Sequence, residues 1–211
     1  YTQRYTLSLH DALPISPGYT EEDYLAHVDG RPRDDGIRTF LASRGVVLPE
    51  GGPDDPPGAA TVSGIGNAKN ARVAELLAAG VEAYPGSVRL LEHLRAIGMP
   101  MAVVSSSRNT PVVLAASGLS AYFPVVVDGT VAAQEALAGK PAPDTFTYAA
   151  AALGVPPARA VVVEDATSGV AAGAAGGFGL VVGVDRGAGA PALLAAGADV
   201  VVHELDELVQ P

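Results

Sequence analysis

The stretch AVVVEDATSGV, residues 160–170, joins a short apolar run to two acids and a segment of small residues. The apolar residues Ala160–Val163 predict a buried strand of a parallel sheet, and Ser168–Ala175 predicts the helix that follows it. Glu164 and Asp165 fall at the carboxyl end of this strand. Because open α/β sheets bind ligands at the carboxyl ends of their strands, the two acids are candidate site residues.

Two other stretches place polar side chains just before a predicted helix. Met101–Val104 is a strand candidate followed by three serines, and GKPAPD, residues 139–144, places Lys140 before prolines that stiffen the backbone. Hydroxyls and free N–H groups at a strand-to-helix turn suit an anion. A lysine ammonium acts on phosphoryl oxygens as a point charge. The candidate anion-binding residues after the first strand are Ser105, Ser106, Ser107, Arg108 and Asn109.

Each motif taken alone also has a purely structural interpretation. Asp165, Thr167 or Ser168 could cap the following helix, and Lys140 could be a solvated charge at a helix entrance. Adjacent carboxylates are nevertheless the oxygen ligands that Mg²⁺ takes together with a substrate phosphate. If the strands are neighbours in a parallel sheet, the three stretches together predict a phosphate and magnesium site.

The chain changes character near residue 80. Apolar β-rich runs alternate with helical patterns over residues 81–211, which predicts an α/β core with a doubly wound parallel sheet. Residues 17–80 are mostly helical in pattern around a loop rich in Pro, Gly and Asp at 49–59, so we expect a partial helical cap there. The strands expected in the core are Met101–Val104, Pro124–Val127, Ala160–Val163, Leu180–Val184 and Asp199–Val202. The helices expected in the cap are Glu21–Val28, Gly36–Arg44 and Asn70–Ala79.

Composition and charge restrict the class of protein. The 211 residues are 48% hydrophobic, with a mean hydropathy of +0.27, enough apolar material for one substantial core. A net charge of −10 with only 13 Lys and Arg disfavours nucleic-acid binding. Ala166–Val184 carries no charge, but Gly176 and Gly177 interrupt it, which favours a helix and a strand over a membrane span. With no cysteine, the chain fits a reducing cytoplasm, and we expect a soluble cytoplasmic monomer.

Residues 1–16 differ from the rest of the chain. Tyr5–Ser16, YTLSLHDALPIS, matches the translation of a common short-read sequencing adapter, so we interpret residues 1–16 as an assembly artefact. A signal peptide is disfavoured because Asp11 interrupts the apolar run. An edge strand at Thr6–His10 is the other alternative, and an uninterrupted genomic reading frame through this segment would contradict the artefact.

The order and spacing of the motifs resemble the haloacid dehalogenase superfamily, and GKPAPDTF and VVVEDATSGV resemble its β-phosphoglucomutase-like branch. The resemblance begins near Tyr19 and continues to the C-terminus. It implies a Rossmann-like core with a helical cap, Mg²⁺ as cofactor and a sugar phosphate as substrate. It also implies that Arg33, in VDGRPRDDG, holds a substrate phosphate and that Lys69, in GNAKN, reaches the active site. In the core it implies catalytic roles for Ser105 and Lys140, metal ligands at Glu164 and Asp165, and phosphate or sugar contacts from Ser106, Ser107, Arg108 and Asn109.

One motif of this family is absent. The family pattern begins with an apolar strand ending in Asp-x-Asp, whose first Asp attacks phosphorus and whose second Asp transfers protons. Asp11 does not fit the pattern, because Leu13 stands where the second Asp belongs. We therefore expect the central first strand to be missing or replaced, which leaves neighbouring strands with unpaired backbone groups.

Two functions remain open at this point. In the first, the intact parent is a Mg²⁺-dependent phosphotransferase acting through an aspartyl-phosphate, either a mutase for a glucose phosphate or a phosphatase, and the present chain is inactive. Arg33 and Lys69 favour the mutase. In the second, the chain is a non-catalytic member that binds a phosphate or a partner. The acidic segment Glu204–Glu207 is interpreted as a solvated helix end.

Overall fold

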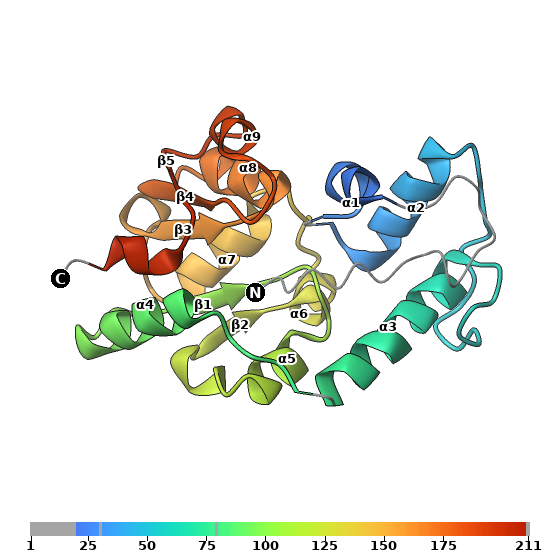
Figure 1. Cartoon of the computed structure of the whole chain (residues 1–211), viewed down its shortest axis with the longest axis horizontal. Coiled ribbons are helices and arrows are strands. Elements are labelled where there is room, and N and C mark those ends of the chain that lie inside the picture. Colours follow the sequence, from blue (N-terminus) through green and yellow to red (C-terminus); the bar gives the residue numbers. More distant parts are fainter. Residues whose placement is uncertain (1–19, 30, 79, 210–211) are drawn as a thin grey trace. The chain divides into compact units, whose positions relative to one another are not determined.

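The computed structural model describes residues 20–29, 31–78 and 80–209. Residues 1–16, which we interpreted as an adapter sequence, lie outside the described part. The internal contacts divide the chain into two compact units, an N-terminal unit that ends at Val81 and a C-terminal unit, Glu82–Pro211. The elements of both units are labelled in Figure 1.

The N-terminal unit is helical. Its helices are α1, Glu21–His27; α2, Arg33–Ser43; and α3, Val62–Ala78. Thr20 caps α1, because its hydroxyl accepts a hydrogen bond from the N–H of Asp23 at 3.1 Å. Arg44, which follows α2, ties the first two helices together through an ion pair with Asp23 at 2.6 Å. The buried side chains between α2 and α3 are Ile37, Phe40, Leu41, Val62 and Ile65.

Helix α3 begins eight residues before the start expected at Asn70, so that expectation was wrong. The glycines at 64 and 66 suggested a loop, but Thr61 caps this end by accepting the N–H of Gly64 at 2.9 Å. The N–H of Val62 also donates to the carbonyl of Pro49 at 2.9 Å, which closes the preceding loop. Tertiary contacts therefore override the low helix propensity of glycine here.

Over its described residues, 82–209, the C-terminal unit has five parallel strands: β1, Ala102–Val104; β2, Val125–Val127; β3, Val161–Glu164; β4, Leu180–Val184; and β5, Val200–Val202. Its helices are α4, Pro85–Ala96; α5, Thr110–Ala116; α6, Gly129–Gln134; α7, Asp144–Ala152; α8, Thr167–Ala175; and α9, Ala190–Ala195. Three 3-10 turns are η2, Ser120–Tyr122; η3, Pro157–Arg159; and η4, Leu205–Leu208. The α/β class with parallel strands is thereby confirmed, and each apolar run expected as a strand forms one.

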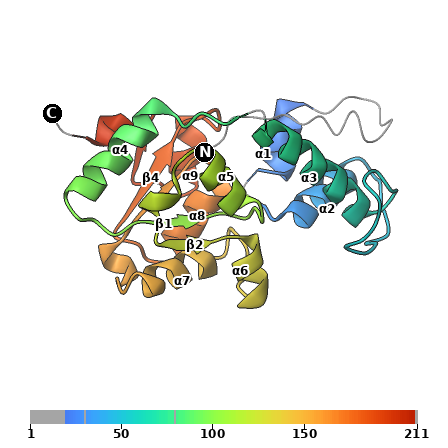
Figure 2. The same cartoon turned by 90° about the horizontal axis from the view of Figure 1, so that it is seen from below.

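The strands form two sheets, β1–β2 and β3–β4–β5. Within residues 20–29, 31–78 and 80–209, β1 pairs only with β2, and β3 pairs only with β4. One edge of β1 and one edge of β3 thus have no partner strand in this part of the chain. Helix α7 contacts β1, β2 and α8, and Figure 2 shows it beside the two-stranded sheet.

The three-stranded sheet is covered by helices on one face. Val162, Val170, Val181 and Leu193 are buried in this layer with Phe146 of α7. A Cβ at Gly173 of α8 would lie 3.1 Å from Val162, so the glycine allows close approach of helix and strand.

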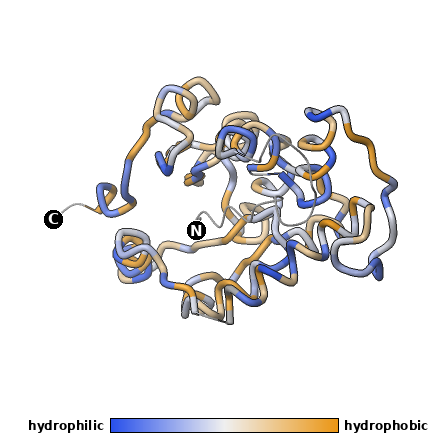
Figure 3. The backbone as a smooth tube through the Cα atoms, turned by 45° about the vertical axis from the view of Figure 1, so that its right-hand side comes forward, coloured by the Kyte–Doolittle hydropathy of each residue, from blue (hydrophilic) through white to orange (hydrophobic). Residues whose placement is uncertain are grey.

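On the other face of this sheet, Val182, Val184 and Val202 pack against Leu205 and Leu208 of η4. Figure 3 shows the resulting alternation of apolar and polar stretches along the chain. No helix in the described part of the chain is long and apolar enough to cross a membrane.

Candidate functional site

Lys140 connects the carboxyl ends of β1 and β3. Its amine forms an ion pair with Glu164, the last residue of β3, and donates to the carbonyl of Val104, the last residue of β1, at 3.4 Å. The two charged side chains are only 6% and 9% exposed. The amine also lies 4.8 Å from the centre of the Phe146 ring, within range of a cation–π interaction. The peptide bond between Lys140 and Pro141 is cis.

The first turn of α8 fixes the Glu164 carboxylate from the other side. The N–H of Ala166 donates to its Oε2 at 3.3 Å. A Cβ at Gly169 would overlap the Glu164 carboxylate, so only glycine leaves room for it. The carboxylate is therefore held between α8 and the Lys140 amine.

Asp165 follows Glu164 directly and is half-buried. Mg²⁺ takes hard oxygen ligands and is held in proteins by one or two carboxylates together with substrate phosphate and water. The donor type of these two acids fits that ion. Within the described residues no three His, Cys, Asp or Glu side chains cluster as a metal site, so the remaining ligands would come from a phosphate, water or a further segment.

The serines after β1 form a turn held by its own hydroxyls. The N–H of Ser105 donates to the carbonyl of Val127 at 2.9 Å and extends the β1–β2 ladder. The hydroxyl of Ser105 accepts the N–H of Ser107 at 3.2 Å, and the Ser107 hydroxyl accepts the N–H of Asn109 at 3.1 Å. Ser105 is thus fixed next to Val104, whose carbonyl receives the Lys140 amine.

The next residues of this turn lie close to the starts of α5 and α6. Arg108 is exposed, and Asn109 precedes α5. A Cβ at Gly129 would lie 2.7 Å from the carbonyl oxygen of Ser106, so a glycine is required where α6 begins. Helix α6, which the sequence did not predict, is capped by Asp128, whose carboxylate accepts two N–H groups at 2.9 Å.

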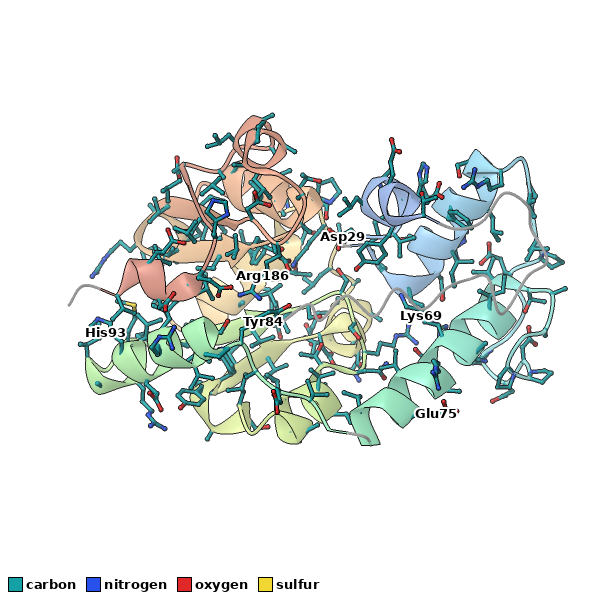
Figure 4. The ribbon with its side chains drawn as sticks, in the orientation of Figure 1. Asp29, Lys69, Glu75, Tyr84, His93 and Arg186 are labelled. Atoms are coloured by element: carbon teal, nitrogen blue, oxygen red, sulfur yellow. The ribbon has the colours of Figure 1, made fainter. Side chains whose placement is uncertain are left out.

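The two cations expected in the cap belong to the helical unit. The Arg33 side chain bonds to Asp34 at 2.6 Å and to Asn67 at 3.3 Å. It lies against Gly66 of α3, where a Cβ would come within 2.5 Å of its Nε. Lys69, labelled in Figure 4, also lies on α3.

Desolvation and the positive charge of Arg33 both lower the pKa of the Lys69 amine. Because Lys69 is exposed to solvent, desolvation at its amine is limited, and the charge of Arg33 is the cause that the geometry supports.

The structure thus brings together the end of β1 with Ser105, the buried Lys140 and the end of β3 with Glu164 and Asp165. Arg33 and Lys69 are neighbours within the helical unit. Sequence reasoning missed the residues that shape these places: Gly66, Asn67, Phe146 and Gly169. The available signal was Gly169 in the first helical turn after β3, where a helix packs over the strand end.

The fold and site define a class: an α/β protein with a buried lysine, hydroxyls and two carboxylates at the carboxyl ends of parallel strands. A family model described as haloacid dehalogenase-like hydrolase matches residues 26–177. The chain belongs to this family, and its expected membership of the β-phosphoglucomutase-like branch is confirmed by the relatives.

Two relatives and one solved structure illustrate the similarity. A β-phosphoglucomutase from Mycobacterium bovis is 51% identical over 201 residues, which cover 93% of this chain and 76% of that protein. Hexitol phosphatase A from Escherichia coli is 39% identical over 132 residues, 61% of this chain and 57% of that protein. The crystal structure of CbbY from Rhodobacter sphaeroides in complex with xylulose-(1,5)bisphosphate matches with a TM-score of 0.72 and 25% identity, covering 90% of this chain and 81% of that chain.

Proposed function

We propose that this protein serves Mg²⁺-dependent phosphoryl transfer on a sugar phosphate. The observation that carries the proposal is the buried Lys140 amine, which bonds to Glu164 at the end of β3 and to Val104 at the end of β1. A cation held at this depth can neutralise phosphoryl oxygens and the carboxylates that crowd around them.

Each core residue has a role in this proposal. Lys140 and the Ser105 hydroxyl bind the transferring phosphoryl group, while Ser106, Ser107, Arg108 and Asn109 contact the distal phosphate or the sugar. Glu164 and Asp165 would hold Mg²⁺, which when bound supplies positive charge for the phosphoryl oxygens. Lys140 also keeps Glu164 in place, because its amine and α8 fix the carboxylate from two sides.

The attacking carboxylate is the part of the reaction that this chain does not supply. The sequence contains no Asp-x-Asp, and the edges of β1 and β3 lack a partner strand in the described part of the chain. We infer that the intact parent has an apolar strand there, ending in Asp-x-Asp, and that its first Asp forms an aspartyl-phosphate. Removing that Asp removes both the covalent step and a metal ligand, so the present chain is expected to be inactive.

The choice between mutase and phosphatase depends on the helical unit. Arg33 and Lys69 would hold a second phosphate, which a mutase needs in order to present both phosphates of a bisphosphate. The 51% identical relative named β-phosphoglucomutase favours this outcome, whereas the relative named hexitol phosphatase A supports release to water. We also propose that the protein is a cytoplasmic monomer that binds no nucleic acid, in line with its charge and lack of cysteine.

A non-catalytic phosphate-binding protein of the same fold is the second candidate, and the missing Asp-x-Asp favours it. The genomic sequence upstream of residue 17 distinguishes the two, because an Asp-x-Asp-Gly reading frame supports the enzyme. Protein carrying that strand is then assayed with β-glucose 1-phosphate and Mg²⁺. Glucose 6-phosphate as product identifies a mutase and inorganic phosphate a phosphatase, while an Asn-x-Asn variant of the same length is the matched control. If the restored protein binds phosphate without turnover, the enzyme proposal fails.

A further inference from the structure

Arg186 lies on the site edge of the sheet but does not join the site. It follows β4 by two residues, and β4 pairs with β3 so that Gly183 stands opposite Glu164. Its guanidinium carbon lies only 3.6 Å from the centre of the Tyr84 ring, and its side chain is 11% exposed. Figure 4 shows Arg186 and Tyr84 side by side. A planar guanidinium stacked on an aromatic face is an attractive contact, strongest where water is excluded.

Tyr84 occupies a special place in the chain. It is the residue before Pro85, the first residue of α4, and it stands at the N-cap position of that helix. The residues just before it connect the two compact units, which divide after Val81. Within this connection Gly80 has a φ of +98° and Glu82 is exposed. Arg186 therefore contacts the chain, through Tyr84, at the place where the connection enters the C-terminal unit.

Acidic residues at the C-terminal turn η4 make further contacts with Arg186 and with α4. Nη2 of Arg186 lies 3.6 Å from the Glu204 carboxylate, and a Cβ at Gly86 in the first turn of α4 would lie 3.0 Å from the same carboxylate. Arg89 of α4 forms an ion pair with Asp206 of η4, and this partner lowers the pKa of Asp206. Glu204 and Glu207 are exposed at the start of η4, in keeping with the expectation of a solvated helix end, although two of the acids in residues 204–207 pair with arginines.

We propose that Arg186 is a positioning residue for the connection between the two units. By stacking on Tyr84 it fixes the start of α4 to the end of β4, and with it the point where the connection enters the C-terminal unit. Lysine replaces it only in part, because an ammonium keeps the positive charge over the ring but has no plane to stack on it. If residues of both units act on one substrate, which rests on the proposed function, Arg186 would fix the point from which the connection to the helical unit starts.

A protease that cuts after Glu tests the proposal without any need for activity. Glu82 is exposed in the connection, whereas Glu164 ends β3 with a side chain only 9% exposed, so the two cleavage rates report local opening and global unfolding separately. In the whole chain, Arg186→Ala is expected to raise the cleavage rate after Glu82 about threefold to tenfold and to leave the rate after Glu164 unchanged. Arg186→Lys, which loses the planar stack but keeps the charge, should raise the same rate by a smaller factor than Arg186→Ala.

The matched control is Arg95→Ala. Arg95 stacks on Tyr122 with 4.7 Å between guanidinium and ring centre, in the same unit but away from the connection. It should leave the rate after Glu82 unchanged. Tyr84→Leu removes the other partner and should reproduce the effect of Arg186→Ala, with no further increase in the double variant. An unchanged rate after Glu82, a parallel rise after Glu164, or additive effects of the two substitutions would each overturn the proposal.

Discussion

Replacement of Lys140 by Met tests the buried ion pair on which the site depends. The Lys140 and Glu164 side chains are 6% and 9% exposed, so removing the amine leaves a carboxylate in a place that water hardly reaches. Removing one partner of a buried pair costs about 3–5 kcal/mol. The N–H of Ala166 remains as a weak partner at 3.3 Å, which does not compensate a full charge.

This cost converts into a measurable shift of the melting temperature. The C-terminal unit runs from Glu82 to Pro211, and unfolding entropies are about 2.1 cal/mol/K per residue. For such a unit, a loss of about 3–5 kcal/mol lowers Tm by about 11–18 °C. Thermal unfolding followed by circular dichroism at pH 7, together with urea unfolding at low temperature, measures the effect.

Two further variants separate the buried pair from a general effect of charge removal. Arg72→Met breaks the exposed pair between Arg72 and Glu75, whose side chains are 56% and 64% exposed, and should change the free energy of unfolding by less than about 0.5 kcal/mol. The double variant Lys140→Met with Glu164→Leu removes both charges and should recover most of the lost stability. The reasoning is refuted if Lys140→Met costs no more than Arg72→Met, or if the double variant is less stable than Lys140→Met.

Three other predictions concern single side chains. Gly66→Ala pushes the flexible Arg33 side chain away from α3. A calorimetric titration of the active, restored protein should then show weaker substrate binding at an unchanged Tm. A lower Tm would contradict a role of Arg33 in substrate binding. Ser105→Ala removes a hydroxyl and should weaken binding of inorganic phosphate about fivefold to tenfold by titration calorimetry, with equal affinity as the opposing result. The backbone N–H of Gly187 lowers the pKa of Asp185, and the N–H groups of Gly189 and Ala190 add to this effect. The ionised Asp185 therefore stabilises the fold fully above the unfolded pKa of about 3.9. This contribution to the free energy of unfolding is lost as the pH falls through the lower pKa of the folded state. The stability difference between wild type and Asp185→Asn should therefore be largest near pH 7 and shrink below about pH 4 in urea titrations, and a pH-independent difference would contradict this.

The strands of the core could be predicted because short apolar runs bounded by turn residues carry a strong local signal. Helix α6 could not, since its six residues depend on the Asp128 cap rather than on a periodic pattern. The start of α3 was misplaced because the glycines at 64 and 66 suggested a loop, whereas the close approach of Ala59 to Gly64 and of Arg33 to Gly66 favours glycine inside the helix. The pairing of the strands into two sheets could not be predicted from the sequence either, because it depends on tertiary contacts.

The candidate site could likewise be predicted from the sequence only in part. The positions of Lys140 and Glu164 at the ends of elements were visible in the sequence, because polar residues that interrupt an apolar run stand out. Their burial together depends on Gly169, Phe146 and the Val104 carbonyl, and of these only Gly169, in the first helical turn after β3, offered a signal in the sequence. The stack of Arg186 on Tyr84 joins residues 102 positions apart, and it became apparent only in the folded unit.

The central claim is that the ends of β1 and β3, joined by Lys140, form a phosphoryl-transfer site that lacks its Asp-x-Asp strand, with the attacking carboxylate and the proton-transferring Asp. The most direct measurement is turnover of β-glucose 1-phosphate in Mg²⁺ by three proteins: the present chain, the same chain with its parental Asp-x-Asp strand in place of residues 1–16, and that restored chain carrying Lys140→Ala. The account predicts turnover by the restored chain alone. Equal turnover by the present chain, or full turnover by the Lys140→Ala protein, would contradict it.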